Sequence, residues 1–470
     1  MKTLKIFIKI ILAIAIIYLG LLLYFRTKDP IIKWNWRKIN TSEINFPKDF
    51  MWGVATAAHQ VEGGHQDINN WGWWEKQSLP EGGPTIAGGQ KSGLADDNWH
   101  RYLSDIQLMR KLGVNAYRFS VSWSKIMPTP DSIDKSALRH YQIMCDTLEK
   151  YGITPVVTLF HYTYPLWFQD SGAFEYEKNI KYFVEFSQQV YKALHTRVKY
   201  WCTINEPVVF AYSSYFSGEY PPGKRDPQLT AKVLANLLKA HVKVYYALKA
   251  MPDGRDSKIG IVKNITQMDP YRKWNLADNI IAYFADLNFN ESVLKAFSTG
   301  TFRFYMPTMV NYKENIQYIS KSLDFIGLNY YSHYAFKFNK NLDAALTPLP
   351  YPGETMTDMD YGIYPEGIYR AIKRISKLGV PIIITENGIA DSLDNRRGMF
   401  IKQSLYAVSK AIKDGYDVRG YFYWSLMDNF EWNLGFSKRF GLYKVDYKTL
   451  NRTLRKSAQE YINIIREARK

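Results

Sequence analysis

The chain has 470 residues and a mass of 54.8 kDa, and its 61 Lys and Arg against 44 Asp and Glu give a formal net charge of +17. A hydrophobic fraction of 46% and an aromatic fraction of 16% exclude a disordered or collagen-like chain, because that much apolar surface must be buried. The two cysteines, Cys145 and Cys202, exclude a disulfide framework and a thiolate-rich metal site. The basic charge favours an anionic partner, either nucleic acid or a membrane surface.

The charge is concentrated at the N-terminus, where residues 1–40 hold eight basic side chains and one acidic one, or +7 of the +17. Residues 6–25 are apolar except for Lys9 and reach the ~20 residues that a helix needs to cross the hydrocarbon core. Lys9 can extend its ammonium group to the lipid headgroups. We therefore predict a transmembrane or signal-anchor helix over residues 1–26. The alternative is a cleaved signal peptide, but the apolar run ends in Leu-Leu-Leu-Tyr-Phe-Arg and lacks a small-x-small cleavage site.

A juxtamembrane linker is expected over residues 27–45. Its Trp34 and Trp36 lie among basic residues, which suits either a membrane interface or a linker that packs on the body of the protein. Basic residues flank both ends of the anchor, so the positive-inside rule has little asymmetry to use. As a single-pass signal anchor, the helix would place the body outside the cytoplasm.

From residue 46 onward, short β-rich runs alternate with helical patterns. The runs cover residues 50–57, 115–122, 153–160, 200–205, 258–264, 323–331, 381–386 and 418–426. Several are nearly continuous in Val, Ile, Leu and aromatic residues, as strands buried on both faces must be. Eight strands that alternate with helices predict an α/β fold, a single (β/α)8 TIM barrel over residues 46–470 preceded by one transmembrane helix.

Two of the predicted strands end in a glutamate, Glu206 and Glu386. A charged side chain directly after a buried strand is unfavourable unless it is paired or used, so each could be a helix N-cap, a structural ion pair or a catalytic group. In a TIM barrel both would face the same mouth, at the carboxyl ends of the strands. Two carboxyl groups among Trp, Tyr, His, Asn and Gln suit glycoside hydrolysis, which uses one as acid and the other against an oxocarbenium-like centre.

Six motifs in order carry a resemblance to a known family. They are Phe50-Met-Trp-Gly-Val-Ala-Thr-Ala-Ala-His-Gln60-Val-Glu62-Gly, Ala116-Tyr-Arg118-Phe-Ser-Val-Ser-Trp, Trp201-Cys-Thr-Ile-Asn205-Glu206-Pro, Phe325-Ile-Gly-Leu-Asn329-Tyr-Tyr331, Ile384-Thr-Glu386-Asn-Gly, and Tyr423-Trp424-Ser-Leu-Met-Asp-Asn-Phe-Glu431-Trp432 with Arg439-Phe440-Gly after it. The chain from Phe46 to about Ile465 resembles glycoside hydrolase family 1, the β-glucosidase-like retaining enzymes.

The resemblance implies a role for each matched residue. Glu206 would be the acid/base and Glu386 the nucleophile, with Arg118 keeping Glu386 ionised and Tyr331 orienting it. The sugar would be bound by the matched positions Gln60, His161, Asn205, Asn329, Glu431 and Trp432, with Trp424 as the stacking platform and Phe440 as a further contributor. From the residues alone, Arg118 could instead be a buried ion pair, and Trp424 and Phe440 could be core aromatics. No cofactor and no metal are implied.

The matched residues also narrow the substrate. Glu206 is present, which favours ordinary O-glycosides, and Glu431 stands where the phospho-glycosidase branch has phosphate-binding residues, so a non-phosphorylated glucoside or galactoside is expected. One motif departs from the family's usual His-Trp-Asp-Leu-Pro and reads His161-Tyr162-Thr163-Tyr164-Pro165. The surroundings of the sugar 3-hydroxyl are therefore altered.

Four functions compete at this point. The first is a membrane-anchored hydrolase of terminal β-D-glucosides or galactosides, and the second is a transglycosylase that passes the sugar to a lipid or sugar hydroxyl with the same catalytic residues. Tethering near a bilayer makes glycolipids candidate substrates for either enzyme. A catalytically silent barrel is disfavoured because both glutamates are present, and nucleic-acid binding ranks last because no recognised module or focused basic helix is found. The sequence does not determine the oligomeric state.

Overall fold

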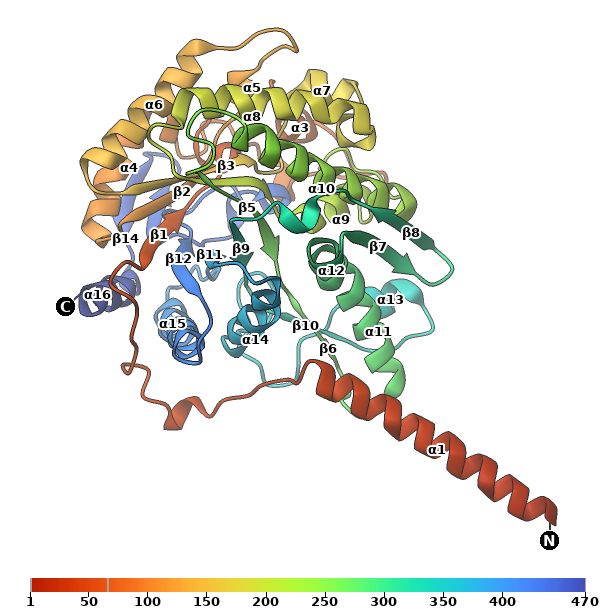
Figure 1. Cartoon of the computed structure of the whole chain (residues 1–470). Coiled ribbons are helices and arrows are strands. Elements are labelled where there is room, and N and C mark those ends of the chain that lie inside the picture. The colour runs from red at the N-terminus through yellow and green to blue at the C-terminus, as the bar shows by residue number, and fades with distance from the viewer. Residues whose placement is uncertain (1, 66, 470) are drawn as a thin grey trace.

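Eight parallel strands close into one barrel in the computed structural model, which describes residues 2–65 and 67–469 (Figure 1). The strand order is β1-β12-β11-β9-β5-β4-β3-β2. The strands are β1 (Met51–Ala55), β2 (Ala116–Ser120), β3 (Thr154–Phe160), β4 (Tyr200–Asn205), β5 (Lys258–Asn264), β9 (Phe325–Asn329), β11 (Ile382–Asn387) and β12 (Val418–Trp424). Each lies within or one residue beyond a predicted β-rich run, so the predicted (β/α)8 barrel is confirmed.

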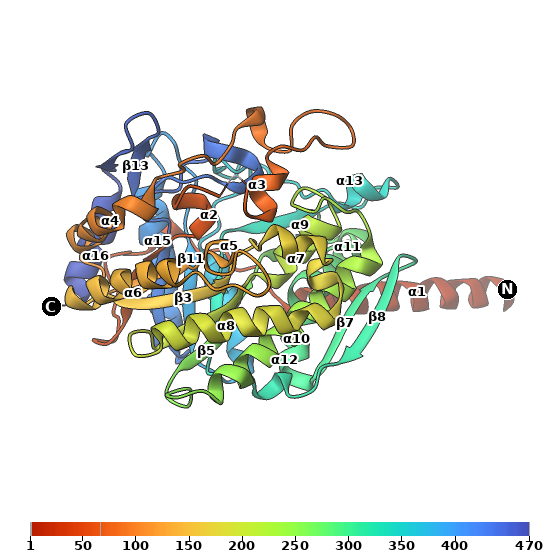
Figure 2. The same cartoon turned by 90° about the horizontal axis from the view of Figure 1, so that it is seen from above.

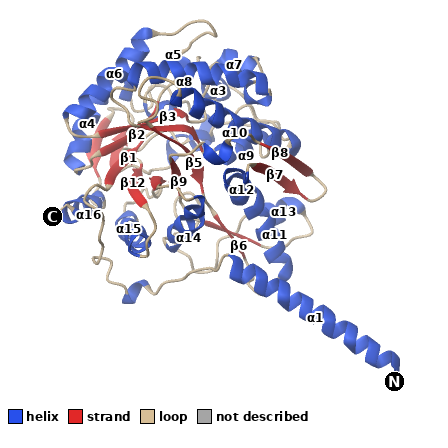
Figure 3. Cartoon of the chain, viewed as in Figure 1, coloured by secondary structure: helices blue, strands red, loops and turns tan. Residues whose placement is uncertain are grey.

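Helices surround the barrel on its outside, one after each strand (Figure 3). In chain order the covering helices are α4 (Asn98–Leu112), α6 (Lys135–Lys150), α8 (Ile180–Leu194), α10 (Pro227–Lys249), α12 (Ser292–Thr299), α14 (Glu366–Ile375), α15 (Arg397–Lys413) and α16 (Ala458–Ala468). Local chemistry sets their ends. The Asp134 carboxylate accepts hydrogen bonds from two backbone N–H groups at the start of α6, and Gly113 ends α4 with a φ of 77° that glycine adopts without strain.

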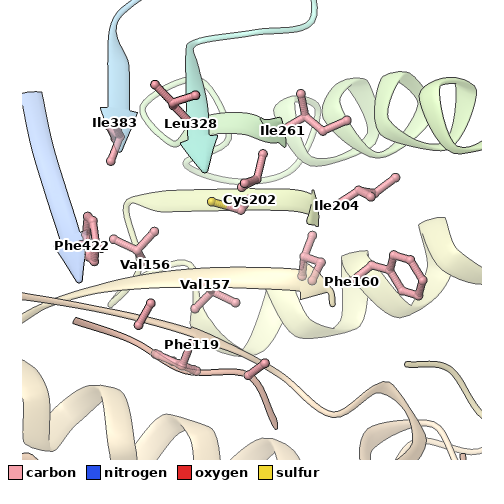
Figure 4. Close-up of a cluster of buried hydrophobic side chains, with 14 of the residues drawn as sticks. Phe119, Val156, Val157, Phe160, Cys202, Ile204, Ile261, Leu328, Ile383 and Phe422 are labelled. Carbon is pink, nitrogen blue, oxygen red and sulfur yellow. The ribbon is translucent and has the colours of Figure 1, made fainter. Parts of the chain in front are cut away.

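The core lies between the strands and in the layer beneath the helices. Apolar side chains from neighbouring barrel strands gather there, including Phe119, Val157, Ile261, Leu328 and Phe422 (Figure 4). All five are at most 3% exposed. Cys202 lies in the same cluster as a buried free thiol. This packing holds the carboxyl ends of the strands at fixed positions, which a multi-residue site requires.

The loops at the carboxyl ends of β5 and β9 carry structure of their own, which the sequence did not reveal. Strand β6 (Gln267–Pro270) follows β5 and pairs in parallel with β10 (His333–Phe336), which follows β9. The helices α11 (Leu276–Asp286) and α13 (Leu342–Leu346) occupy the rest of these insertions. The hairpin β7 (Thr301–Met306) and β8 (Val310–Asn315) lies instead between α12 and the start of β9. A second hairpin, β13 (Tyr443–Asp446) with β14 (Asn451–Leu454), follows β12.

Five short helices complete the loops near the barrel mouth. They are α2 (Ala58–Val61), α3 (Asn70–Trp74), α5 (Trp123–Ile126), α7 (Leu166–Asp170) and α9 (Pro207–Tyr215). Helix α9 begins directly after Glu206, with Pro207 in its first turn, where the missing N–H group leaves no helical hydrogen bond unmade.

The N-terminal helix α1 (Lys2–Lys28) projects away from the body (Figures 1 and 2). It is long and apolar enough to cross a membrane, and only 6% of its most apolar window is buried, so it is not a core helix. Its contact with the body begins at Tyr18, whose hydroxyl donates to the Trp274 carbonyl oxygen at 3.2 Å, and Leu22 is its buried side chain.

The segment after α1 is packed on the body rather than free. The Trp34 backbone N–H and the Trp36 indole N–H both donate to Glu366 Oε1, at 2.9 and 3.0 Å. The Tyr364 hydroxyl donates to the Ile32 carbonyl oxygen, and the Trp34 ring lies 5.7 Å from that of Tyr369. Of the two interpretations of the tryptophan-rich linker, the packed one matches these contacts.

Candidate active site

Polar side chains from most of the barrel strands meet at the carboxyl face of the barrel. Glu206 follows β4, Glu386 is the penultimate residue of β11, Arg118 comes from β2 and Tyr331 follows β9. Because parallel strands end at the same face, these side chains converge although up to 268 residues separate them in the chain.

Glu386 is held at both carboxylate oxygens. Arg118 Nη1 donates to Oε1 at 2.6 Å, and the Tyr331 hydroxyl donates to Oε2 at 2.7 Å. The Arg118 and Glu386 side chains are 1% and 5% exposed, so this is a buried ion pair. Such a pair fixes the direction of the carboxylate, because a buried charge without a partner is strongly unfavourable.

The pKa of Glu386 reflects two opposing effects. Burial raises this pKa to about 7, and the negative charge of Glu206 also acts to raise it, while the Arg118 guanidinium and the Tyr331 hydroxyl act to lower it. Arg118 was predicted to keep Glu386 ionised, and it does favour the ionised form, but burial outweighs it. At neutral pH the carboxyl therefore lies near the midpoint of its titration.

Glu206 is held by three donors. Asn329 and Asn264 donate through Nδ2 to Oε1, at 2.8 and 3.0 Å, and the Tyr162 hydroxyl donates a short hydrogen bond to Oε2. Glu206 itself has a backbone φ of 45°, which is unusual for a residue other than glycine and turns the chain from β4 into α9.

Asn205 links the surroundings of the two glutamates. Its Oδ1 accepts from Arg118 Nη2 at 2.7 Å and from Asn329 Nδ2 at 3.2 Å, and its Nδ2 lies 3.2 Å from His161 Nε2. Asn329 in turn accepts from the Thr385 hydroxyl at 2.7 Å. The two carboxyl groups therefore share one hydrogen-bonded network.

Aromatic rings and a third carboxyl group form another wall of the site. The His161 ring lies 5.9 Å from both Trp424 and Trp432, and the Phe440 ring lies 6.1 Å from that of Tyr331. Gln60 Nε2 donates to Glu431 Oε2 at 3.2 Å. Burial and the charge of Glu386 raise the pKa of Glu431 to about 8. Flat rings beside groups that can both donate and accept hydrogen bonds suit the two kinds of surface on a sugar.

The chain matches a known protein family over most of its length. A family model described as "Glycosyl hydrolase family 1" matches residues 42–470. The chain belongs to glycosyl hydrolase family 1. It is 34% identical over 446 residues to Beta-glucosidase A of Thermotoga maritima, an alignment that covers 90% of this chain and 98% of that protein. The solved structure of a beta-glycosidase from Pyrococcus horikoshii superposes with a TM-score of 0.81 at 40% identity and covers 90% of this chain and 96% of its own.

A further relative has a different named substrate. The chain is 32% identical over 462 residues to a 6-phospho-beta-galactosidase of Clostridium acetobutylicum, covering 88% of this chain and 95% of that protein. The family and enzyme class predicted from the motifs are therefore confirmed, whereas the choice of sugar within the family is not decided by similarity.

The family-1 chain brings all the predicted site residues into one contiguous group. Nine are joined by hydrogen bonds or ion pairs and the other three by ring contacts. The set is Gln60, Arg118, His161, Asn205, Glu206, Asn329, Tyr331, Glu386, Trp424, Glu431, Trp432 and Phe440. Their individual catalytic and binding roles remain predictions. Among the described residues, no group of three or more His, Cys, Asp and Glu side chains is arranged to hold a metal ion.

Sequence reasoning missed two hydrogen-bond donors in this site. Asn264, the last residue of β5, and Tyr162 both contact Glu206. Tyr162 stands where the family usually has tryptophan. The sequence shows this difference from the family motif, but it does not show the hydrogen bond from the Tyr162 hydroxyl to Glu206. The position of Asn264 at a strand end was the one available signal for it.

The pKa of Glu386 predicts how activity depends on pH. If Glu386 is the nucleophile, as the resemblance implies, it attacks only when ionised. Its pKa is about 7, so kcat/KM for an aryl β-glucoside should then rise with pH through about 7 and fall roughly tenfold for each pH unit well below it. The Tyr331 hydroxyl lowers this pKa, so Tyr331→Phe should move the acid limb to higher pH. An acid limb near pH 4.5, the value of an exposed glutamate, would contradict the assignment.

The Tyr162 contact gives a second prediction. Tyr162→Phe removes one hydrogen bond to Glu206 and leaves the ring in place, so it should lower kcat/KM by about 10- to 100-fold, the scale of a hydrogen bond to a charged group. The loss should be larger for alkyl glycosides, which need protonation of the leaving oxygen, than for nitrophenyl glycosides, which need little. An equal loss for both classes would show that the hydroxyl serves only sugar binding or folding.

Proposed function

We propose that the protein is a retaining β-glycosidase that hydrolyses terminal, non-phosphorylated β-D-glucosides and galactosides through a covalent glycosyl–enzyme intermediate. The main observation in support is the buried Glu386 carboxylate, which accepts hydrogen bonds from Arg118 and Tyr331. The same hydrogen-bonded network holds Glu206. Two carboxyl groups supported in this way provide a nucleophile and an acid/base, which double displacement requires.

In the first step, a Glu386 oxygen would attack the anomeric carbon while the glycosidic C–O bond breaks. The proton on Glu206 would pass to the departing oxygen, so the aglycone leaves as a neutral alcohol. In the second step, Glu206 would take a proton from water, and the hydroxide would attack the anomeric carbon and release Glu386. The two inversions return the β configuration.

The surroundings of Glu431 support a sugar without a phosphate group. Its polar partners are the neutral side chains of Gln60 and Trp424, and burial raises its pKa to about 8. A carboxyl group close to neutrality can both donate to and accept from sugar hydroxyls. A phosphate ester at this point would have no cation among these partners to offset its charge.

A panel of nitrophenyl glycosides tests the proposal with the full-length protein. We expect turnover of β-D-glucoside and β-D-galactoside, with NMR showing the β-anomer of the free sugar formed first. The matched controls are the α-D-glucoside and the 6-phospho-β-D-glucoside, which should be poor substrates. Initial release of the α-anomer would refute retention, and a preference for the phosphorylated sugar would refute the substrate class.

A glycolipid substrate is a finer proposal, supported by where α1 meets the body. The parts of the body next to α1 are α11 and β6, which follow the carboxyl end of β5. Strand β6 pairs with β10, which follows β9, so this region extends from the face that holds the glutamates. If α1 crosses a bilayer, the mouth of the barrel lies on the side of the molecule that carries the anchor.

Vesicles separate this proposal from simple hydrolysis. Full-length protein reconstituted in vesicles that contain a β-glucosyl lipid should hydrolyse it faster than the same protein in plain vesicles mixed with separate glucosyl-lipid vesicles. A soluble aryl glucoside serves as control and should be hydrolysed equally in both. Equal rates on the lipid would refute a role for tethering. Products that carry additional sugars on lipid, with little free glucose, would favour transglycosylation over hydrolysis.

A further inference from the structure

Basic side chains around the junction of α1 with the body lie over aromatic rings. Arg26 lies 3.8 Å from the centre of the Trp274 ring, and Lys28 lies 4.6 Å from that of Tyr283. Two more pairs follow at 5.6 and 5.5 Å, Lys33 over Tyr351 and Lys337 over Tyr271, and the two tyrosine rings stack on each other. We call these four cations and their rings the basic collar. Cation–π contact holds each charge in place without neutralising it.

The collar has no counter-charge of its own. Within the part of the chain that the structure describes, none of its four cations forms an ion pair with a carboxylate. The nearby carboxylates of Asp29, Asp269 and Asp286 are already paired with Arg370 or Arg374, with Asp269 to Arg370 at 2.9 Å. The collar therefore presents net positive charge to whatever lies against it.

A cavity of about 160 Å³ opens beside the collar, between the end of α1 and α11. Arg26, Lys28 and Lys273 line it together with Phe25 and Tyr283, and the three paired aspartates form part of its wall. The cavity thus combines aromatic and apolar surface with Arg26, Lys28 and Lys273, none of which forms an ion pair with a carboxylate among the described residues.

The position of the cavity along α1 indicates what reaches it. The apolar side chains of α1 before Tyr18 are exposed, and its contact with the body begins at Tyr18. Trp274, 61% exposed, lies at this junction, and Trp, Tyr, Lys and Arg are the residues that mark the level of lipid headgroups. A bilayer around the free part of α1 would therefore place its headgroups against the cavity.

We propose that this cavity binds the phosphate group of an anionic membrane lipid, with Arg26, Lys28 and Lys273 as its ligands. The proposal rests on insertion of α1 in a bilayer and is independent of the glycosidase reaction. The lipid phosphate would contact the three cations, while its acyl chains would lie along the exposed apolar surface of α1. Free inorganic phosphate offers the same charge but lacks the apolar part.

Native mass spectrometry of the full-length protein in dodecyl maltoside micelles tests this with phosphatidylglycerol as the probe. The test variant is Arg26→Gln with Lys28→Gln and Lys273→Gln. The control variant removes three exposed cations that also lie over tyrosines but on α6 and around α8, far from α1, as Lys150→Gln with Lys178→Gln and Lys181→Gln (Figure 1). Hydrolysis of a soluble aryl β-glucoside reports that each variant is folded.

The wild type should retain phosphatidylglycerol in preference to phosphatidylcholine. The test variant should bind it about 100-fold more weakly, since each cation near an anionic lipid surface contributes about fivefold, and the control variant should match the wild type. If excess inorganic phosphate displaces the lipid, the cavity recognises the phosphate group alone. If it does not, the cavity recognises the headgroup and the acyl chains together. Equal retention by the wild type and the test variant, or an equal loss in the control variant, would overturn the proposal.

Discussion

Replacing Glu386 with Gln should abolish hydrolysis of aryl β-glucosides, with a loss of at least about 10⁴-fold in kcat, the scale of removing a covalent nucleophile. The amide has nearly the volume of the carboxylate but cannot form the glycosyl ester. It also leaves Arg118 as a buried cation without its partner. No change in the leaving group should restore activity, because the defect lies in the attacking atom.

Thermal unfolding and substrate binding provide the controls for this variant. The amide leaves the Arg118 cation buried without its charged partner, which is unfavourable, so we expect the variant to fold with a lower Tm than the wild type. The inactive variant should still bind cellobiose, measured by calorimetry, since the aromatic wall and Gln60 are intact. Activity within tenfold of the wild type would eliminate Glu386 as the nucleophile and with it the double-displacement mechanism.

Replacing Glu206 with Gln should produce a loss that depends on the leaving group. A dinitrophenol leaves as an anion without protonation, so its release in the first step should be nearly unaffected, whereas an alkyl β-glucoside should lose about 10²- to 10⁴-fold, the range of general acid catalysis. The second step lacks its base, so the glycosyl enzyme should accumulate and dinitrophenol should appear as a burst.

Rescue by azide distinguishes this defect from a damaged site. Azide needs no deprotonation to attack the glycosyl enzyme, so it should raise the steady-state rate and yield the β-glycosyl azide. The same anion should leave Glu386→Gln inactive, which makes the two variants controls for each other. A uniform loss across all leaving groups, with no burst, would assign Glu206 to binding or structure instead.

The barrel was predictable because its strands obey a local rule. Residues 153–160 and 381–386 are almost continuous runs of apolar residues, as burial on both faces demands, and they became β3 and β11 with shifts of one residue. The positions of Glu206 and Glu386 at the barrel mouth were predictable for a related reason, since a charged residue directly after such a strand stands out against its surroundings.

Features that depend on distant packing were not predictable. Nothing local indicates that β6 pairs with β10 across 66 residues, or that Glu366 accepts hydrogen bonds from Trp34 and Trp36 more than 300 residues earlier in the chain. Tyr162 is the instructive case in the site. Its sequence position shows a departure from the family, but neither its backbone φ of 67° nor the contact of its hydroxyl with Glu206 is displayed by any sequence pattern.

The packed linker would fix the distance between the barrel and any bilayer that α1 crosses. If residues 29–45 were a free chain, the body could move relative to α1, because a flexible linker of that length has a root-mean-square end-to-end distance of about 23 Å. Instead it is fastened at one end by Arg370 to Asp29 and at the other by the hydrogen bonds between Asn45 and Ser409. With α1 in a bilayer, the barrel would be held rigidly relative to the membrane. It would reach substrates at one depth and in one orientation while it diffuses laterally in two dimensions.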